Sequence, residues 1–340
     1  MSPSVDVPGG APAAVATGLG FGCAELFRLP SARARRRVLD AALDAGIVHV
    51  DVAPMYGLGL AEGELGAVLR GRRDRIAIAT KFGIGVTPLA RAIGTVQGPI
   101  RRVMRARPEV HAAARDSGAG PASGPVGALL YRDAGYDASA ARRSLQQSLR
   151  ALRTDHVDLL LLHDPPPSRV AADLAGHLQQ LAAEGLIGAW GVAGEVADAV
   201  AAAQRLGPRT PVLQIRDNLL RRGLEALPPQ LGARRITFGT LGEVIAPILA
   251  HVHADADVRR AWSRAIGRDT ADPDVVAALL LRDARRRNPD GLTLFSTTRP
   301  ERIAPAVAAG LGGADDESVD ALRALIAATM DDRWPAELVA

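Results

Sequence analysis

The chain has 340 residues, of which 48% are hydrophobic, 23% charged and only 3% aromatic, and its formal net charge is +4. This composition predicts a globular core of Ala, Val, Leu and Ile, and the arginines are scattered among carboxylates, which argues against nucleic-acid binding. Cys23 is the only cysteine, so an internal disulfide and a multi-cysteine metal site are excluded and a reducing cytoplasm is expected.

The first residues predict a short disordered tail. Residues 1–13 are rich in Pro and Gly and have neither a basic flank followed by an apolar core nor a run long enough to span a bilayer. We therefore expect a soluble, cytoplasmic protein without a membrane partner, whose single domain fills residues 14–340.

Short apolar runs alternate with helical patterns along nearly the whole chain, which is typical of βαβ units and a parallel sheet. Strands are expected at residues 15–21, 48–53, 76–82, 157–163, 189–193, 212–215, 236–238 and 292–296. Helices are expected at residues 31–45, 139–153 (behind an Asp137 cap), 171–184 and 196–206. Eight strands in one uninterrupted alternation favour closure over an open doubly wound sheet. We predict an α/β fold, a (β/α)8 TIM barrel with long loops at its C-terminal face.

Two segments interrupt this alternation. Residues 85–135 are rich in Gly, Ala, Pro and Arg and are too long for an ordinary connection. Because this insertion follows the third strand, we interpret it as a flexible flap at the active face; a solvated insertion is the alternative. Leu241–Pro273 holds a helical start followed by polar, Arg-rich sequence and suggests a second lid.

One lysine stands out because lysine is otherwise absent. Lys81 is the single Lys among the 41 Lys and Arg residues, and it lies at the end of a predicted strand. A drift toward arginine would replace a lysine whose task is only to be positive, whereas a compact ammonium that must approach a phenol closely resists replacement. The alternative is that Lys81 has been retained by chance, with its aliphatic chain buried and its ammonium in water.

Three more polar residues lie at or just beyond the ends of predicted strands. Asp51 ends one apolar run, Tyr56 follows it, and His163 ends the most apolar strand of the chain. Each alone is weak evidence, because such residues are often helix caps, packing aromatics or structural histidines. In a barrel, however, all strand ends meet at one mouth, so the four residues are expected to converge.

Their chemistry is coherent. A free phenol has a pKa of about 10, and a neighbouring ammonium stabilises the phenolate and lowers that pKa. We expect Lys81 to act on Tyr56 in this way, Asp51 to hold Lys81, and a neutral His163 to hydrogen-bond a substrate carbonyl. Tyr56 would then be the general acid for reduction or the general base for alcohol oxidation.

This set resembles the aldo-keto reductases. The likeness lies in the segments Gly46–Gly57, Glu64–Gly66, Ala79–Gly83 and Ser144–His163, and extends more weakly from about Gly18 to Ala309. It implies a catalytic tetrad of Asp51, Tyr56, Lys81 and His163, a nicotinamide cofactor bound in extended form at the barrel mouth, and no Rossmann domain. The Gly18–Gly22 segment then becomes the first barrel strand rather than a dinucleotide fingerprint.

The resemblance also implies cofactor contacts. Gln214 would bind the carboxamide, Phe238 would stack on the nicotinamide ring, and Leu241 and Gly242 would follow the pyrophosphate. The remaining cofactor positions are Gly22, Asp51, Ser296, Thr297, Thr298, Arg299 and Arg302. Two arginines facing a 2′-phosphate favour NADPH over NADH, and surface arginines at a solvated helix start are the alternative.

Two departures from the family pattern concern the cofactor. Ala193-Gly194 stand where the family has Ser-Asn at the carboxamide, and Pro305-Ala306 replace a Glu-Asn pair near the adenine. Each lost hydrogen bond is worth about 0.5–1.5 kcal/mol net. We therefore expect weaker NADPH binding than the family norm, without its loss.

The leading interpretation is an NADPH-dependent reductase that converts an aldehyde or ketone, such as a sugar or natural-product intermediate, to an alcohol. The alternatives are a sugar or alcohol dehydrogenase in the oxidative direction, a nucleotide-binding sensor with little turnover, and a Rossmann dehydrogenase. The small-molecule substrate would be lined by Cys23, Leu26, Met55, the Asp164–Ser168 loop and the two flaps; no metal is expected.

Overall fold

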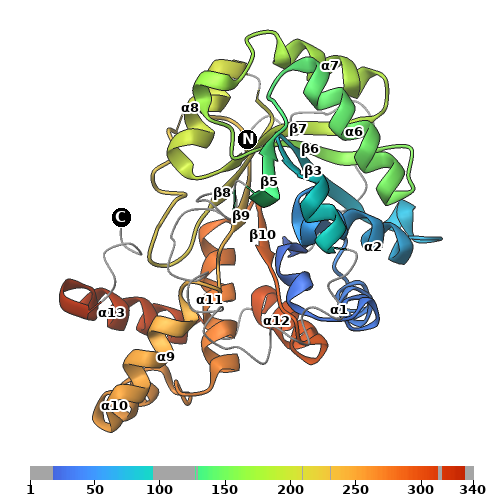
Figure 1. The fold of residues 1–340 in the computed structure, drawn as a ribbon. Helices are drawn as coiled ribbons and strands as arrows, with labels where there is room; N and C mark the ends of the chain where they lie inside the picture. The colour runs from blue at the N-terminus through green and yellow to red at the C-terminus, as the bar shows by residue number, and fades with distance from the viewer. Residues whose placement is uncertain are drawn as a thin grey trace.

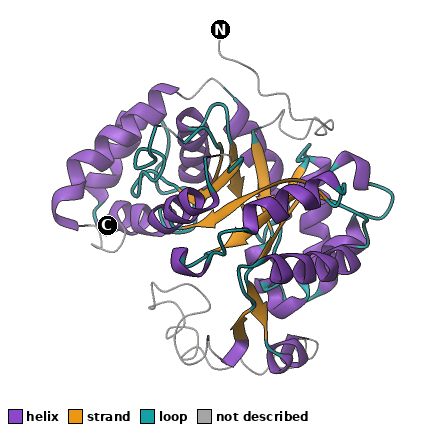
Figure 2. Ribbon diagram, turned by 90° about the horizontal axis from the view of Figure 1, so that it is seen from above, coloured by secondary structure: helices purple, strands orange, loops and turns teal. Residues whose placement is uncertain are grey.

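The computed structural model describes residues 18–94, 127, 129–208, 210–229, 231–312 and 316–333. Eight parallel strands close into a barrel in the order β1-β10-β9-β8-β7-β6-β3-β2. They are β1 (Leu19–Gly22), β2 (His49–Asp51), β3 (Ala77–Phe82), β6 (Val157–His163), β7 (Ile187–Gly194), β8 (Val212–Arg216), β9 (Arg234–Phe238) and β10 (Leu292–Phe295). Helices surround this central barrel (Figure 2). The predicted (β/α)8 barrel is confirmed.

The helices of the outer layer alternate with the strands in the sequence and lie around them (Figure 1). They are α1 (Ala32–Asp44), α2 (Ala61–Val68), α6 (Ala138–Leu152), α7 (Leu174–Ala183), α8 (Val196–Leu206), α11 (Pro273–Arg287) and α12 (Ile303–Leu311). The predicted cap of α6 is present, since the Asp137 side chain accepts a hydrogen bond from the backbone N–H of Ala140. Short 3-10 turns occupy Ala24–Arg28, Tyr56–Gly59, Arg73–Arg75, Pro167–Arg169 and Pro300–Arg302.

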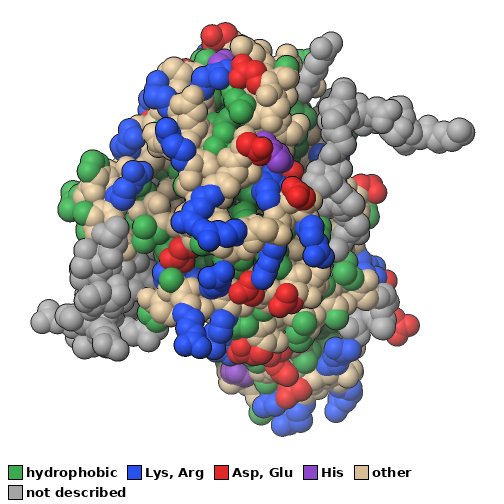
Figure 3. All heavy atoms as spheres, turned by 90° about the vertical axis from the view of Figure 1, so that its right-hand side faces the viewer, with side chains coloured by type: hydrophobic (Ala, Val, Ile, Leu, Met, Phe, Trp, Pro, Cys, Tyr) green, Lys and Arg blue, Asp and Glu red, His purple; other side chains and the backbone are tan. Residues whose placement is uncertain are grey.

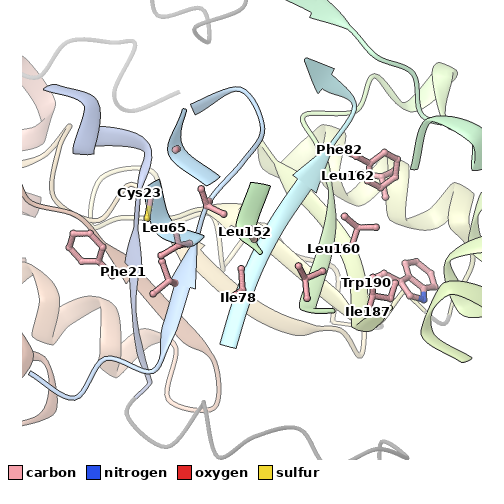
Figure 4. Packing of buried hydrophobic residues seen from close by; sticks show 14 of the residues in the cluster. Phe21, Cys23, Leu65, Ile78, Phe82, Leu152, Leu160, Leu162, Ile187 and Trp190 are labelled. Carbon is pink, nitrogen blue, oxygen red and sulfur yellow. The ribbon is translucent and has the colours of Figure 1, made fainter. Parts of the chain in front are cut away.

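Alternation along each strand divides the core in two. Ile78, Leu160 and Leu162 belong to the large cluster that joins the outer faces of the strands to helix residues such as Leu65 and Leu152 (Figure 4). Their neighbours on the other face of the strands form a smaller cluster inside the barrel. It contains Ala79, Leu159, Leu161, Ala193, Val212, Ile236, Leu292 and Leu294. The barrel is therefore filled by side chains, and its chemistry is confined to the strand ends.

A helical layer lies beside the barrel, at the lower left of Figure 1. It consists of α9 (Ile245–Ala254), α10 (Ala256–Ile266) and α13 (Asp316–Arg333). These helices share a separate apolar cluster with α11, which includes Val252, Trp262, Leu280 and Leu322. The segment that the sequence suggests as a second lid is thus a packed pair of helices.

A chain of buried charges connects this layer to the barrel. Asp217, just after β8, pairs with Arg287 of α11 at 2.6 Å. Arg287 also pairs with Asp283 at 2.9 Å, and Arg323 of α13 reaches the same carboxylate at 2.5 Å. Both aspartates are fully buried. Because buried carboxylates require close cationic partners, these contacts tie α13 to the end of a barrel strand.

Most of the predicted flap, residues 95–126 and 128, and the predicted tail lie outside the described residues. The two ends of the flap pair as an antiparallel hairpin of β4 (Ile84–Val86) and β5 (Tyr131–Asp133). In the described part of the chain, no helix combines the length and apolar character needed to cross a membrane. On the face in Figure 3, basic and acidic side chains are interspersed.

Candidate active site

The predicted site residues occupy the inner face of the strands at their C-terminal ends. Lys81 follows Ala79 by two residues, His163 follows Leu161, and Gln214 follows Val212, so each continues an inward-facing row. Asp51 is paired in register with Gly22 on one side and Ala79 on the other. The same alternation points Phe238 inward. The structure thus brings residues from many parts of the sequence to one mouth.

Lys81 is the centre of the site. Its ammonium Nζ lies 2.5 Å from Asp51 Oδ1, and it donates hydrogen bonds of 3.2 Å to Tyr56 Oη and to the Val52 carbonyl. The Lys81 and Asp51 side chains are only 2% and 4% exposed. A buried ammonium needs this pairing to stay charged, and Asp51 raises the pKa of Lys81 against the opposing effect of burial. The ammonium is therefore fixed against the phenol.

Tyr56 is held by the turn that follows β2. Its backbone N–H donates to the Ala53 carbonyl at 3.1 Å. The next two residues, Gly57 and Leu58, both have positive φ (61° and 58°), and the backbone of Gly57 lies so close to Phe27 that a Cβ there would clash at 2.4 Å. This tight turn sets the phenol over Lys81.

The pKa of Tyr56 differs from the expectation of an acidic phenol. Burial raises the pKa of Tyr56 to about 12, and Lys81 lowers it only in part. The effect of the ammonium has the expected direction, but removal of the phenolate from water is the larger effect. The hydroxyl is consequently protonated at neutral pH and poised to donate.

His163 faces the phenol edge-on. The two ring centroids are 5.8 Å apart at 85°. Burial, reinforced by the Lys81 ammonium, lowers the pKa of His163 well below its ordinary value, so the imidazole is neutral. Tyr136 fixes the end of the strand through a 2.6 Å hydrogen bond from its hydroxyl to the His163 carbonyl. A neutral ring carries one N–H, which can donate to a substrate oxygen without adding charge.

Gln214 and Phe238 line the opposite side of the mouth. Gln214 is buried, and its Oε1 has no hydrogen-bond partner among the described residues. Such an orphaned acceptor fits a ligand N–H, as in a carboxamide. One face of Phe238 is occupied by the Arg216 guanidinium, 5.0 Å from the ring centroid, which is itself held by Glu195 at 2.6 Å and by Glu243. Ring stacking is therefore left to the other face.

The remaining predicted cofactor residues follow two strand ends. Gly22 ends β1 beside Ser296, with room for only about a methyl group between them, while Leu241 and Gly242 follow β9. Residues 296–299 follow β10, and the Thr297 hydroxyl caps the Arg299 N–H. Arg302 ends the 3-10 turn just before α12, and its Nε lies 2.8 Å from Asp274 of α11. The Arg302 guanidinium, which the resemblance assigns to a phosphate, is therefore paired with Asp274 in this structure.

Several residues at the mouth have no role in the sequence analysis. Arg216, Glu195 and Glu243 form a charged group around Phe238, and Asp274 pairs with Arg302. Nothing in the local sequence identifies these pairings, because their members lie 21 to 28 positions apart on different elements. Asp164 is placed in a substrate-lining loop by the sequence, and its position directly after the strand-end His163 is a signal for a closer role.

Comparisons with known proteins show which family the chain resembles. The Aldo/keto reductase family model matches residues 18–229. D-threo-aldose 1-dehydrogenase from Pseudomonas sp. is 35% identical over 206 residues, 57% of this chain and 56% of that protein. 6-dehydroglucose reductase from Agrobacterium fabrum is 34% identical over 159 residues, 45% and 41% of the two chains. The chain thus spans about half the length of these curated relatives.

Solved structures share the fold over nearly the whole chain. The glycerol dehydrogenase from Gluconobacter oxydans superposes with a TM-score of 0.65 at 18% identity and 94% coverage of both chains. An aldo-keto reductase from Klebsiella pneumoniae, solved in complex with NADPH, gives 0.58 at 23% identity and 90% coverage of both. The resemblance found in the sequence is confirmed, and the chain belongs to the aldo/keto reductase family of oxidoreductases.

Proposed function

We propose that this protein is an NADPH-dependent reductase that converts an aldehyde or ketone to an alcohol. The observation that carries the proposal is the buried Lys81 ammonium, which contacts both the Asp51 carboxylate at 2.5 Å and the Tyr56 hydroxyl at 3.2 Å. A phenol held against a fixed ammonium is a proton donor whose conjugate base is stabilised in place.

The residues of the chain supply the proton and the polarisation of the substrate. Tyr56 donates its hydroxyl proton to the carbonyl oxygen, and Lys81 stabilises the phenolate that remains until solvent returns a proton. The neutral imidazole of His163 orients the same oxygen by a hydrogen bond. A reduced nicotinamide, when bound, supplies the hydride that the carbonyl carbon receives.

The cofactor proposal rests on the other side of the mouth. The Oε1 of Gln214, which has no partner among the described residues, suits a carboxamide, and the face of Phe238 opposite Arg216 suits a planar ring. Leu241, Gly242 and the segment from Ser296 to Arg299 would follow the phosphates, with Arg302 at the 2′-phosphate. The NADPH complex of the Klebsiella pneumoniae relative supports this choice by analogy.

The protonated state of Tyr56 suits the reductive reaction at neutral pH. Oxidation of an alcohol requires the phenolate as base, and a phenol whose pKa is about 12 is protonated at neutral pH. One relative carries the name of an aldose dehydrogenase, so oxidation is the second candidate, with a rate that should rise toward alkaline pH.

A carbonyl panel assayed with NADPH and NADH in parallel tests the proposal. We expect turnover of aldehydes or ketones with NADPH, and a loss of about 10²- to 10⁴-fold in kcat for Tyr56→Phe, the range of general acid catalysis. NADPH binding, followed by fluorescence, should be retained in the variant because the hydroxyl faces the substrate. Near-wild-type rates in Tyr56→Phe would refute the mechanism, and NADPH binding without any turnover would favour a sensor.

A further inference from the structure

Asp164 occupies an unusual position beside the reacting groups. It directly follows His163, and its φ of +43° is a left-handed conformation that few side-chain-bearing residues adopt. Two contacts hold it there: its N–H donates to the Ala193 carbonyl at 2.8 Å, and its carbonyl accepts a 3.3 Å hydrogen bond from the Tyr136 hydroxyl. These contacts fix the backbone of Asp164 directly beside His163.

The carboxylate itself lies at the mouth. Its Oδ2 is 3.9 Å from His163 Nε2, and the side chain is 52% exposed. On the neighbouring strand, Gly194 leaves it room, since a Cβ on this residue would come within 3.0 Å of Asp164 Oδ1. The absence of a side chain at Gly194 thus lets the carboxylate occupy the space beside His163.

No described residue donates a hydrogen bond to this carboxylate. The nearby cations are committed elsewhere: Lys81 to Asp51 and Tyr56, and Arg216 to Glu195 and Glu243. An ionised carboxylate only accepts hydrogen bonds. Asp164 is therefore a solvent-exposed acceptor next to the groups that would hold a carbonyl oxygen.

We propose that Asp164 accepts a hydrogen bond from a hydroxyl on the carbon next to the reacting carbonyl, so that the enzyme selects α-hydroxy carbonyl compounds of the sugar type. This assignment rests on the proposed reductase function. The 3.9 Å between His163 Nε2 and Asp164 Oδ2 is a span that two neighbouring substrate oxygens can bridge. One oxygen accepts hydrogen bonds from Tyr56 and His163, and the other donates a hydrogen bond to Asp164.

The same charge acts against other substrates. A carboxylate or phosphate on the adjacent carbon would be repelled by Asp164, and a methylene there would leave the acceptor to water. Because the side chain is half exposed, water replaces the lost hydrogen bond and the discrimination is moderate. A hydrogen bond to a charged group corresponds to about a 10- to 100-fold preference.

The test compares kcat/KM for D-glyceraldehyde and propanal in the wild type, Asp164→Ala and Asp164→Asn. We expect the wild type to prefer glyceraldehyde by about 10- to 100-fold, and Asp164→Ala to reduce the ratio to near one. Asp164→Asn keeps an acceptor oxygen and removes the charge, so it should retain part of the ratio and reduce glyoxylate faster than the wild type does. Differences in aldehyde hydration cancel when the ratio of a variant is compared with that of the wild type, and the wild-type ratio itself is calculated on the concentration of free aldehyde.

Asp198→Asn is the matched control. This exposed aspartate lies in the first turn of α8 and contributes to the field at Asp164, but it has no contact with His163. Its glyceraldehyde-to-propanal ratio should equal that of the wild type. A wild-type ratio retained in Asp164→Ala, or a wild-type ratio near one, overturns the role of Asp164 while the reductase function stands. A wild type that reduces neither aldehyde overturns both.

Discussion

The two sides of the barrel mouth hold their charges differently. On the side of β2, β3 and β6, the Lys81 and Asp51 side chains are 2% and 4% exposed and in contact before any ligand arrives. On the side of β9 and β10, the Arg302 and Asp274 side chains are 34% and 58% exposed. The first pair cannot exchange partners without leaving an unpaired buried charge, whereas the second can do so at little energetic cost. The ion pair on the reaction side is therefore fixed before any ligand binds, whereas the ion pair on the proposed cofactor side can exchange partners.

The strongest test of this contrast is stability. Asp51→Asn leaves the buried Lys81 ammonium without its counter-ion, which should lower the free energy of unfolding by about 3–5 kcal/mol. Asp274→Asn removes an exposed partner and should change it by about 1 kcal/mol or less. Urea unfolding of both variants against the wild type measures the difference. Equal losses in the two variants would contradict a preset reaction side.

Lys81→Met tests whether the preset ammonium serves the reaction. The rate of carbonyl reduction should fall by about 10²- to 10³-fold, as when a preorganised electrostatic group is removed. Tyr56 donates only when protonated, so reduction is lost as the pH rises through its pKa. Lys81 lowers that pKa from the value set by burial, and its removal should move the alkaline limb of kcat/KM to higher pH. An alkaline limb that moves to lower pH would exclude the effect of Lys81 on the pKa of Tyr56. Lys81→Arg is the control because it keeps the positive charge.

The smallest effects are expected on the cofactor side. Arg302→Ala should weaken NADPH binding by about 10- to 100-fold and leave NADH binding unchanged, because only NADPH has a 2′-phosphate. Asp274→Asn should strengthen NADPH binding by roughly two- to fivefold, since the phosphate no longer competes with a carboxylate. Fluorescence titration of both cofactors measures these changes. An equal effect of Arg302→Ala on the two cofactors would show that Arg302 does not bind the 2′-phosphate.

The sequence predicts the barrel well because strands such as β3, β6 and β10 are apolar or nearly so and buried on both faces. The expected strand at residues 157–163 coincides with β6, and the expected helix at residues 196–206 with α8. The β4–β5 hairpin is not predicted, because its two strands lie far apart in the sequence and are only three residues long. Short, partly exposed strands leave no periodic signal.

The site was predictable to the extent that single residue types carry the chemistry. The lone lysine and the strand-end positions of Asp51 and His163 suffice to bring the tetrad to one mouth. The net pKa of Tyr56 was not predictable, because burial acts on it more strongly than the visible neighbour does. The pairing of Asp274 with Arg302 and the room beside Gly194 arise from packing between distant elements, which no local pattern encodes.

The buried carboxylate of Asp283 couples the stability of α13 to that of the barrel. It is shared by Arg287, which also holds Asp217 behind the last residue of β8, and by Arg323 near the far end of the chain. If α13 detached, Asp283 would keep one guanidinium of two, and water would reach the apolar residues of the side layer. These buried charges thus disfavour the fraying of α13. Its detachment would also weaken the contacts that support the end of β8, the strand that carries Gln214.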